Sequence, residues 1–295
     1  MSERPSQVIR VLAAMTLREM VRKRLFTVGA LLTLGFLAVY GLGLHYARED
    51  LLGGAAGTAA DPRWNTARLV VGSQLMAVGL YLGGMLAAFV AALAGAGALQ
   101  GEVESGILQV VAARPVRRAA ILAGKFAAHA LVLGAYAFLV FAAVTLLTHW
   151  VMGVPLPSFL AAGATFALIP ITVSAAAFFV SARLSTLPAG ALLVILIGSA
   201  MVGGMLEQIG AVAGSDALRS VGLYTSLAMP SDSLYRRVAA LLLGDTAGQG
   251  PLGLLTQVGP LGAAAVPSMW VVAYALVYVC ALGLVTALHM ERRDL

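Results

Sequence analysis

Six stretches of this chain are long and apolar enough to cross a lipid bilayer, and they constrain its fold more than any other feature. A hydrocarbon core about 30 Å thick requires roughly 20 apolar residues in a helix, because backbone polar groups find no partners in lipid. The predicted spans cover residues 25–44, 69–99, 126–151, 159–182, 187–206 and 269–290. We therefore expect an all-α integral membrane protein with six transmembrane helices.

The composition agrees with a membrane protein and excludes other classes. Hydrophobic residues make up 60% of the chain and charged residues 11%, whereas soluble domains are about 45–50% apolar and about 25% charged. The excess apolar surface has to face lipid, because an interior of this size cannot enclose it. The 19 Lys and Arg lie between apolar runs and not along one face, so no nucleic-acid partner is expected.

The distribution of Lys and Arg predicts the orientation in the membrane. If the N-terminus is cytoplasmic, thirteen of the 19 Lys and Arg flank the spans on the inside and six on the outside. Cytoplasmic flanks carry such an excess of positive charge in membrane proteins. We expect a multi-pass protein of the cell membrane (inner or plasma membrane) with both termini cytoplasmic.

The segment before the first span, residues 1–24, has the pattern of a basic amphipathic helix. Apolar and small residues recur there at helical spacing, at Ile9, Leu12, Ala13, Thr16 and Met20. A second stripe is basic and consists of Arg10, Arg18 and Arg22. Such a helix lies in the headgroup plane on the cytoplasmic side. The alternative is a solvated basic tail that only sets the topology.

The connections between the predicted spans differ in kind. Residues 45–68 are expected to form a polar, Gly-rich loop, and residues 152–158 and 183–186 tight turns. The long segment 207–268 contains apolar pieces, such as Val238–Leu243, that are too short to span. We interpret it as an external segment with short helices, interfacial or re-entrant, packed against the bundle.

Catalytic and nucleotide-binding motifs are absent from the sequence. Its Gly-Lys pair, Gly124-Lys125, is followed by Phe126 and lacks the preceding glycine of a phosphate loop. No HExxH, CxxC or GxSxG occurs. The four histidines are scattered, at His45, His129, His149 and His289. We expect no catalytic residue, no metal site and no cofactor bound by this chain.

The predicted spans contain almost no titratable group. A proton- or sodium-coupled carrier usually places Asp or Glu near the membrane midplane. Here the acidic residues fall in tails or connections, with Glu207 nearest, at the outer end of the fifth span. Glycine spacings such as Gly79 to Gly83 and Gly35 to Gly43 indicate close helix packing. Energy for any transport therefore has to come from elsewhere.

The charged connection at residues 100–118 is the most informative stretch. Glu102 and Glu104 precede a short amphipathic turn, Pro115 interrupts it, and Arg117 and Arg118 follow. A charged helix–turn element on the cytoplasmic side suits the docking of a soluble partner. The alternative is a basic loop that only sets the topology.

This stretch resembles the cytoplasmic turn of the type-2 ABC exporter permeases, the ABC-2 membrane proteins. Their pattern is E-x-E-x-G-T-L, followed by a Pro-Val break with basic residues and then Gly-Lys. The matching positions are Glu102, Glu104, Gly106, Leu108, Pro115, Val116, Arg118, Gly124 and Lys125. Ile107 stands where the family usually has Thr. Residues 226–243 (SLAMPSDSLYRRVAALLL) resemble the NosY-like branch, which is linked by name to copper-enzyme maturation.

The resemblance implies a single transmembrane permease domain over residues 1–295 that is not itself an enzyme. Two permeases, identical or paralogous, would pair in the membrane lipid, each docked to a separately encoded cytoplasmic ATPase subunit of the ABC type. That ATPase dimer would bind ATP and Mg²⁺. Coupling would involve Glu102, Glu104, Gly106, Leu108, Pro115, Arg117 and Arg118, together with Arg10, Arg18 and Arg22 of the interfacial helix. Substrate would move outward between the two permeases.

Two other classes of function compete with this interpretation. A secondary carrier or channel without an ATPase is the alternative, although the spans hold little charge and nothing resembles a selectivity filter. A membrane enzyme lacks a convergent Asp pair, Ser/His set or metal cluster in the sequence.

Overall fold

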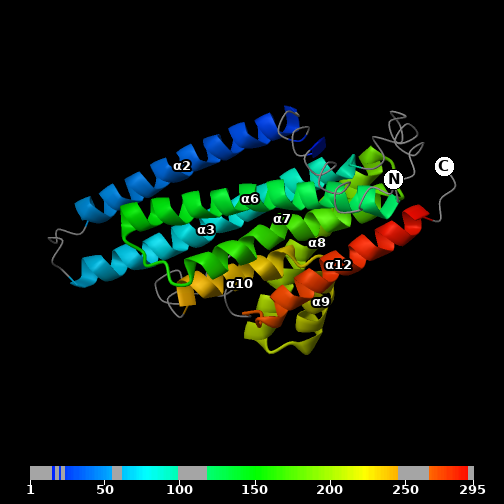
Figure 1. The fold of residues 1–295 in the computed structure, drawn as a ribbon. Helices are drawn as coiled ribbons and strands as arrows, with labels where there is room; N and C mark the ends of the chain where they lie inside the picture. Colours follow the sequence, from blue (N-terminus) through cyan, green and yellow to red (C-terminus); the bar gives the residue numbers. More distant parts are fainter. Residues whose placement is uncertain are drawn as a thin grey trace.

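The structure, a computed structural model, is helical throughout the residues that it describes and contains no strand in them. The described residues are 15–16, 20, 24–54, 62–98, 118–244 and 266–291. Their helices (Figure 1) are α2 Arg24–Gly54, α3 Pro62–Ala96, α6 Arg118–Met152, α7 Phe159–Ser181, α8 Thr186–Ala213, α9 Asp216–Ala228, α10 Ser231–Leu243 and α12 Trp270–Glu291.

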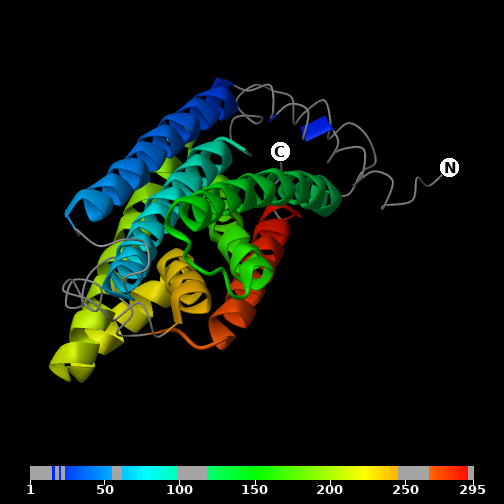
Figure 2. The ribbon, with the colours of Figure 1, turned by 90° about the vertical axis from the view of Figure 1, so that its left-hand side faces the viewer.

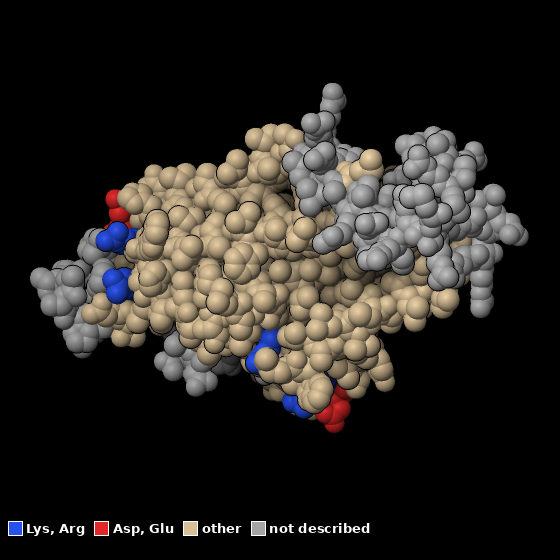
Figure 3. Space-filling model, in the orientation of Figure 1, with Lys and Arg blue, Asp and Glu red and all other residues tan. Residues whose placement is uncertain are grey.

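Six helices in the described part of the chain, α2, α3, α6, α7, α8 and α12, are long and apolar enough to cross a membrane. The start of α2 and the end of α12 lie at the same end of the bundle in Figure 1. In Figure 3, the charged side chains of the described residues on this face lie at the left end and along the lower edge, and the broad area between them shows none. The predicted all-α fold with six spans is confirmed, and the protein is a multi-pass membrane protein.

Helix α7 is the central helix of the bundle. It packs against α3, α6, α10 and α12. Figure 2 shows the bundle from the side that is on the left in Figure 1. Phe166 of α7 and Phe141 of α6 are fully buried, with ring centroids 5.6 Å apart. Because lipid tails are as apolar as these side chains, tight packing of this kind holds membrane helices together more than exclusion from water does.

Helix α2 lies at the edge of the bundle and is joined to it by hydrogen bonds between side chains. The Tyr40 hydroxyl lies 2.6 Å from Thr148 Oγ1, and the Thr33 hydroxyl lies 2.5 Å from the Tyr136 hydroxyl. Both bonds link α2 to α6. Polar contacts of this kind hold a helix that otherwise exposes most of its surface to lipid.

The predicted close packing at the glycine pairs is confirmed for Gly79 and Gly83 and stays a prediction for Gly35 and Gly43. A Cβ added at Gly79 would lie 2.6 Å from the Tyr40 ring, and one at Gly83 would lie 2.9 Å from Val140. These glycines let α3 approach its neighbours closely. Gly35 and Gly43 have nothing within 4 Å of an added Cβ, so they do not mediate packing among the described residues.

Several helices extend beyond the predicted spans. Helix α2 continues to Gly54 and α3 begins at Pro62, so most of the loop predicted at residues 45–68 is helical. In that part of α2, His45 and Glu49 lie 3.3 Å apart at i, i+4 spacing. Helix α6 starts at residue 118 and not near 126. The predicted spans are shorter than the helices because hydropathy detects only the part of a helix that crosses the hydrocarbon core. The helix itself continues into the polar surroundings.

The fifth span also continues further than predicted, which relocates Glu207. Helix α8 ends at Ala213, where Gly214 adopts a left-handed backbone conformation with φ 69° and donates its N–H to the Gly210 carbonyl. Glycine reaches this conformation without steric cost, which explains the position of the helix end. Glu207 therefore lies inside α8, and its predicted place at the end of the span is wrong.

The short helices predicted between the last two spans are present as α9 and α10. They differ in environment. Helix α10 packs against α7 and α3 and buries most of its residues, whereas α9 packs against α8 and leaves Leu223 and Tyr224 exposed. An interfacial position does not describe α10, because both polar and apolar residues of this helix are enclosed by the bundle.

Candidate functional site

Most residues predicted to couple the chain to an ATPase lie outside the described residues. These are Glu102, Glu104, Gly106, Leu108, Pro115, Arg117, Arg10, Arg18 and Arg22. Arg118 is the first residue of α6. The end of α3 and the start of α6 lie at the same end of the bundle as the start of α2 in Figure 1. Both anchors of the connection therefore share that end, and its coupling role stays a prediction.

Besides Arg24, which begins α2, three residues of the predicted interfacial helix fall within the described part of the chain. Thr16 and Met20 belong to the predicted apolar stripe and are buried. Met15 lies outside the stripe and is exposed. The amphipathic helix as a whole stays a prediction.

Helix α10 brings a buried ion-pair cluster into the bundle, which we call the charge cluster and define as Glu207, Asp232 and Arg236. Arg236 Nε donates to Asp232 Oδ2 at 3.0 Å, and Arg236 Nη2 donates to Glu207 Oε2 at 2.6 Å. The side chain of Arg236 is 1% exposed, that of Asp232 6% and that of Glu207 22%. Removing charges from water is costly, so this cluster depends on the geometry of its hydrogen bonds.

A glycine of α8 makes room for the charge cluster. A Cβ added at Gly204 would collide with Asp232 Oδ2. Glycine at this position lets the carboxylate of α10 lie directly against the backbone of α8. The close approach brings Glu207, one turn further along α8, within reach of Arg236.

Burial changes the ionisation of the groups in α10. Desolvation raises the pKa of Asp232 from 3.8 to about 6, although Arg236 lowers it; Glu207 raises it further. Desolvation also raises the pKa of Tyr235, whose hydroxyl donates to the Ala77 carbonyl at 3.0 Å. Asp232 is therefore ionised at neutral pH, and it takes up a proton at a pH only slightly below neutral.

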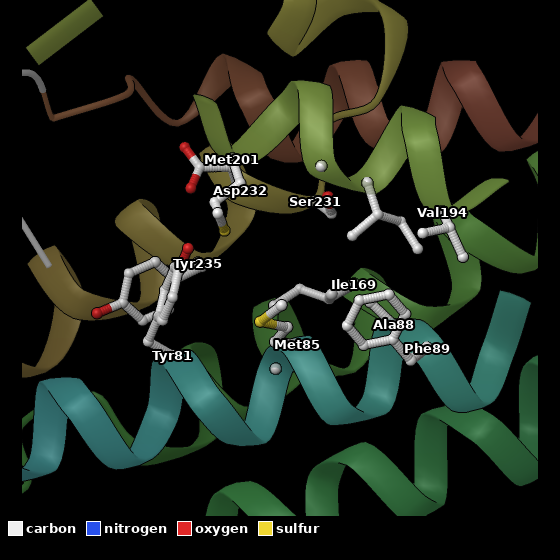
Figure 4. A pocket seen from close by; sticks show the side chains of 13 residues that line it. Tyr81, Met85, Ala88, Phe89, Ile169, Val194, Met201, Ser231, Asp232 and Tyr235 are labelled. Carbon is white, nitrogen blue, oxygen red and sulfur yellow. The ribbon is translucent and has the colours of Figure 1, made fainter. Parts of the chain in front are cut away.

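A pocket of about 140 Å³ lies beside the charge cluster, between α3, α7, α8 and α10. Figure 4 shows Tyr81, Tyr235 and Asp232 at one end, and Phe89 and Val194 at the other. The ring centroids of Tyr81 and Tyr235 are 5.0 Å apart, edge to face. The pocket therefore combines an apolar end with an end that is aromatic and acidic.

Titratable groups inside α6 lie apart from this site. Lys125 and His129 are both buried, and His129 Nδ1 lies 3.0 Å from the Lys125 carbonyl. The His129 ring stacks edge to face on Phe178, with centroids 4.9 Å apart. Among the described residues, no three His, Cys, Asp or Glu side chains gather as a metal site would require.

The charge cluster and the pocket were not predicted from the sequence. One signal was available, because Asp232 and Arg236 stand at i, i+4 spacing inside a short apolar segment. The sequence alone does not show that this segment lies within the bundle, and it does not show which residue of α8 meets it.

The geometry defines a class of protein, a helical multi-pass membrane protein with an ionic cluster and a pocket inside its bundle. A family comparison makes the class specific. The family model described as "ABC-2 family transporter protein" matches residues 7–295, so the chain belongs to the ABC-2 transporter family. Members of this family are membrane components of ABC transporters and are not catalytic themselves. No curated protein is similar enough to match the chain.

Proposed function

We propose that this chain is the permease subunit of an ATP-driven exporter, forming the translocation path and taking its energy from a separate ATPase. The family match over residues 7–295 carries this proposal. The sequence supports it, because it contains no phosphate loop with which the chain could bind ATP itself. By this proposal, two permeases pair in the cell membrane with their termini in the cytoplasm, and two ATPase subunits dock below them.

The connection between α3 and α6 is the proposed docking site for the ATPase. It carries two acidic residues, Glu102 and Glu104, followed by three basic residues, Arg114, Arg117 and, at the start of α6, Arg118. Both helices that anchor it point to the end of the bundle where α2 begins and α12 ends (Figure 1). Closure of the ATPase dimer would be transmitted through this connection and the segment before α2. The assignment to the NosY-like branch is part of the same proposal.

The composition of the purified complex tests the proposal. An affinity-tagged chain, isolated from its own cells in mild detergent, should retain an ABC ATPase, and ATP hydrolysis should require that second polypeptide. Turnover by the chain alone would contradict the proposal. Solute uptake by liposomes containing only this chain, driven by an ion gradient, would favour the alternative of a secondary carrier.

Reversing the acidic charge of the proposed docking site should weaken the complex. For Glu102→Lys with Glu104→Lys we expect normal membrane insertion but loss of ATPase co-purification. Truncating one partner of a partly desolvated ion pair costs about 2–5 kcal/mol, and about 2.8 kcal/mol corresponds to a hundredfold loss of affinity. The measurement is quantitative pull-down of the ATPase together with turnover.

The control for this variant carries the same charge change at the opposite end of the bundle. Glu49→Lys with Asp50→Lys alters the end of α2 that is remote from the connection, and it should retain the ATPase. If the Glu102 and Glu104 variant inserts, binds the ATPase and turns over like the wild type, the connection only sets the topology. Favourable placement of acids at a helix N-terminus, worth about 0.3–1 kcal/mol, would then account for both glutamates.

A further inference from the structure

The pocket beside the charge cluster has the size of a small organic group. Its volume is about 140 Å³, and a cavity of about 150 Å³ with apolar walls accommodates a benzene molecule in another protein. The walls include Met85, Phe89 and Ile169. A single aromatic ring or a short branched alkyl group therefore fits the pocket, and these side chains are the walls that suit it.

The other end of the pocket offers an unused hydrogen-bonding group. The Tyr81 hydroxyl is buried and has no hydrogen-bond partner among the described residues. Buried polar groups are almost always paired in native proteins. Tyr81 and Asp232 both line the pocket, at the end where Figure 4 places them together. A ligand with a polar group at this end would give the hydroxyl its missing partner.

The charge cluster determines the sign of the charge that this end accepts. Two carboxylates, Glu207 and Asp232, share the guanidinium of Arg236 as their ion-pair partner in the described residues. The cluster therefore carries one negative charge in excess when both acids are ionised. The aromatic faces of Tyr81 and Tyr235 also attract cations. An anion would be repelled here, and a neutral group would leave the excess charge uncompensated.

We propose that the pocket binds a small lipophilic ammonium ion, with its apolar group against Met85 and Phe89 and its ammonium group donating to Asp232 and Tyr81. This ion would be the class of solute that the permease exports, and in that respect the proposal rests on the proposed function. Binding of the ion to the pocket does not itself require an ATPase.

Binding of benzylammonium to the purified chain in lipid nanodiscs tests the site without the ATPase. Isothermal titration calorimetry, with empty nanodiscs as the blank, compares it with benzyl alcohol, which has the same ring and no charge. We expect benzylammonium to bind at least tenfold more tightly. Equal affinity for the two compounds, or no binding of either, would overturn the proposal.

Variants assign the binding to this pocket. Gly198 lines the pocket and an added Cβ there has nothing within 4 Å, so Gly198→Leu should place its side chain in the pocket and weaken benzylammonium binding at least tenfold. Gly283→Leu is the matched control, because Gly283 is equally unobstructed and lies on α12, outside the pocket. Wild-type affinity in Gly198→Leu would overturn the proposal.

Two further variants distinguish recognition of the ligand's charge from filling of the cavity. Asp232→Asn should abolish the preference for benzylammonium over benzyl alcohol, and Tyr81→Phe should weaken benzylammonium several-fold while keeping the ring in place. If Asp232→Asn does not fold, Gly198→Leu and Tyr81→Phe still decide the outcome. Preserved preference in Asp232→Asn would assign the charge recognition elsewhere and refute this site.

The intact complex then tests whether the bound ion is the solute. With the ATPase present, benzylammonium should stimulate ATP hydrolysis in the wild type and not in Gly198→Leu. Binding without stimulation would refute the solute class. If no ATPase co-purifies but benzylammonium still binds, only the proposed function is refuted. If another solute stimulates ATP hydrolysis and benzylammonium does not bind, only this inference is refuted.

Discussion

Arg236 is the residue on which the interior of this membrane protein depends most. Its guanidinium is almost fully enclosed and compensates two carboxylates that come from different helices, Asp232 of α10 and Glu207 of α8. A buried ion pair contributes little net stability over an apolar replacement, but removing one partner leaves an uncompensated charge. Losing one member of the cluster should therefore destabilise the protein more than replacing the whole cluster by apolar residues.

Arg236→Met should destabilise the protein by about 3–5 kcal/mol, because it leaves the buried Asp232 and the partly buried Glu207 without a cation. The measurement is thermal unfolding in detergent, followed by loss of monodisperse protein. Arg219→Met is the control: Arg219 lies 3.8 Å from an exposed Asp216, and exposed pairs contribute at most about 1 kcal/mol. Similar losses in the two variants would show that the cluster is not buried as described.

The pH dependence of stability should differ between the wild type and Asp232→Asn. The folded-state pKa of Asp232 is raised from 3.8 to about 6, so the folded state binds more protons than the unfolded state between these values. The stability contributed by this group is therefore present below about pH 4 and is lost as pH rises to about 6, by at most about 3 kcal/mol.

The groups that face Asp232 narrow the interpretation of this pH profile. The charged and titratable groups that act on Asp232 are Glu207 of α8, Tyr81 of α3, and Arg236 and Tyr235 of α10. Helix α7, which packs against α10, has no titratable side chain. Unfolding midpoints between pH 4 and 7 measure the effect, and the wild type should lose stability relative to Asp232→Asn over this window. Parallel profiles would mean that Asp232 titrates normally.

At the scale of helices, the packing of α8 against α9 depends on glycines where the two backbones meet. A Cβ added at Gly222 of α9 would lie 2.6 Å from the Gly203 carbonyl oxygen and 2.8 Å from the Glu207 amide nitrogen, both backbone atoms of α8. Backbone atoms cannot rotate away as the end of a side chain can. The two helices would have to separate to admit a methyl group.

Gly222→Ala should therefore destabilise the protein by about 1–3 kcal/mol, the usual cost of overpacking, and should shift Glu207 relative to Arg236. Thermal unfolding in detergent measures the loss. Gly35→Ala is the control, because nothing lies within 4 Å of an added Cβ there; the better helix propensity of alanine should leave it neutral or slightly stabilised. A neutral Gly222→Ala would contradict the close approach of α8 and α9.

At the scale of the whole molecule, the bundle has two ends that differ in what they carry. One end holds the start of α2, the end of α12 and the anchors of the charged connection, and the other holds the end of α2, the start of α3 and the link from α6 to α7 (Figures 1 and 2). The sequence assigns the first end to the cytoplasm from thirteen Lys and Arg against six.

Single cysteines in a Cys280→Ser background test this orientation. An impermeant maleimide applied to intact cells should label cysteines at Arg63 and Gly248 and should label one at Arg114 only after permeabilisation. Cys280 is exposed on α12, so its replacement removes a competing thiol. Labelling at Arg114 in intact cells would overturn the six-span orientation.

The sequence by itself determined the number and approximate position of the spans, because each span is a local property of about 20 consecutive residues in a bilayer. It also indicated the family, which the match over residues 7–295 confirms. Hydropathy failed at the helix ends, as at Glu207, since a helix continues wherever its backbone bonds continue.

Only the tertiary structure decided the interior of the bundle. Tyr235 meets the Ala77 carbonyl across 158 residues, and Arg236 meets Glu207 across 29. No local pattern encodes such contacts, because they depend on how α8 and α10 are placed against α3 and α7. The pocket and the charge cluster exist only through this placement: in the sequence, Asp232 and Arg236 are two charges in a connection, and in the fold they are buried beside an apolar cavity.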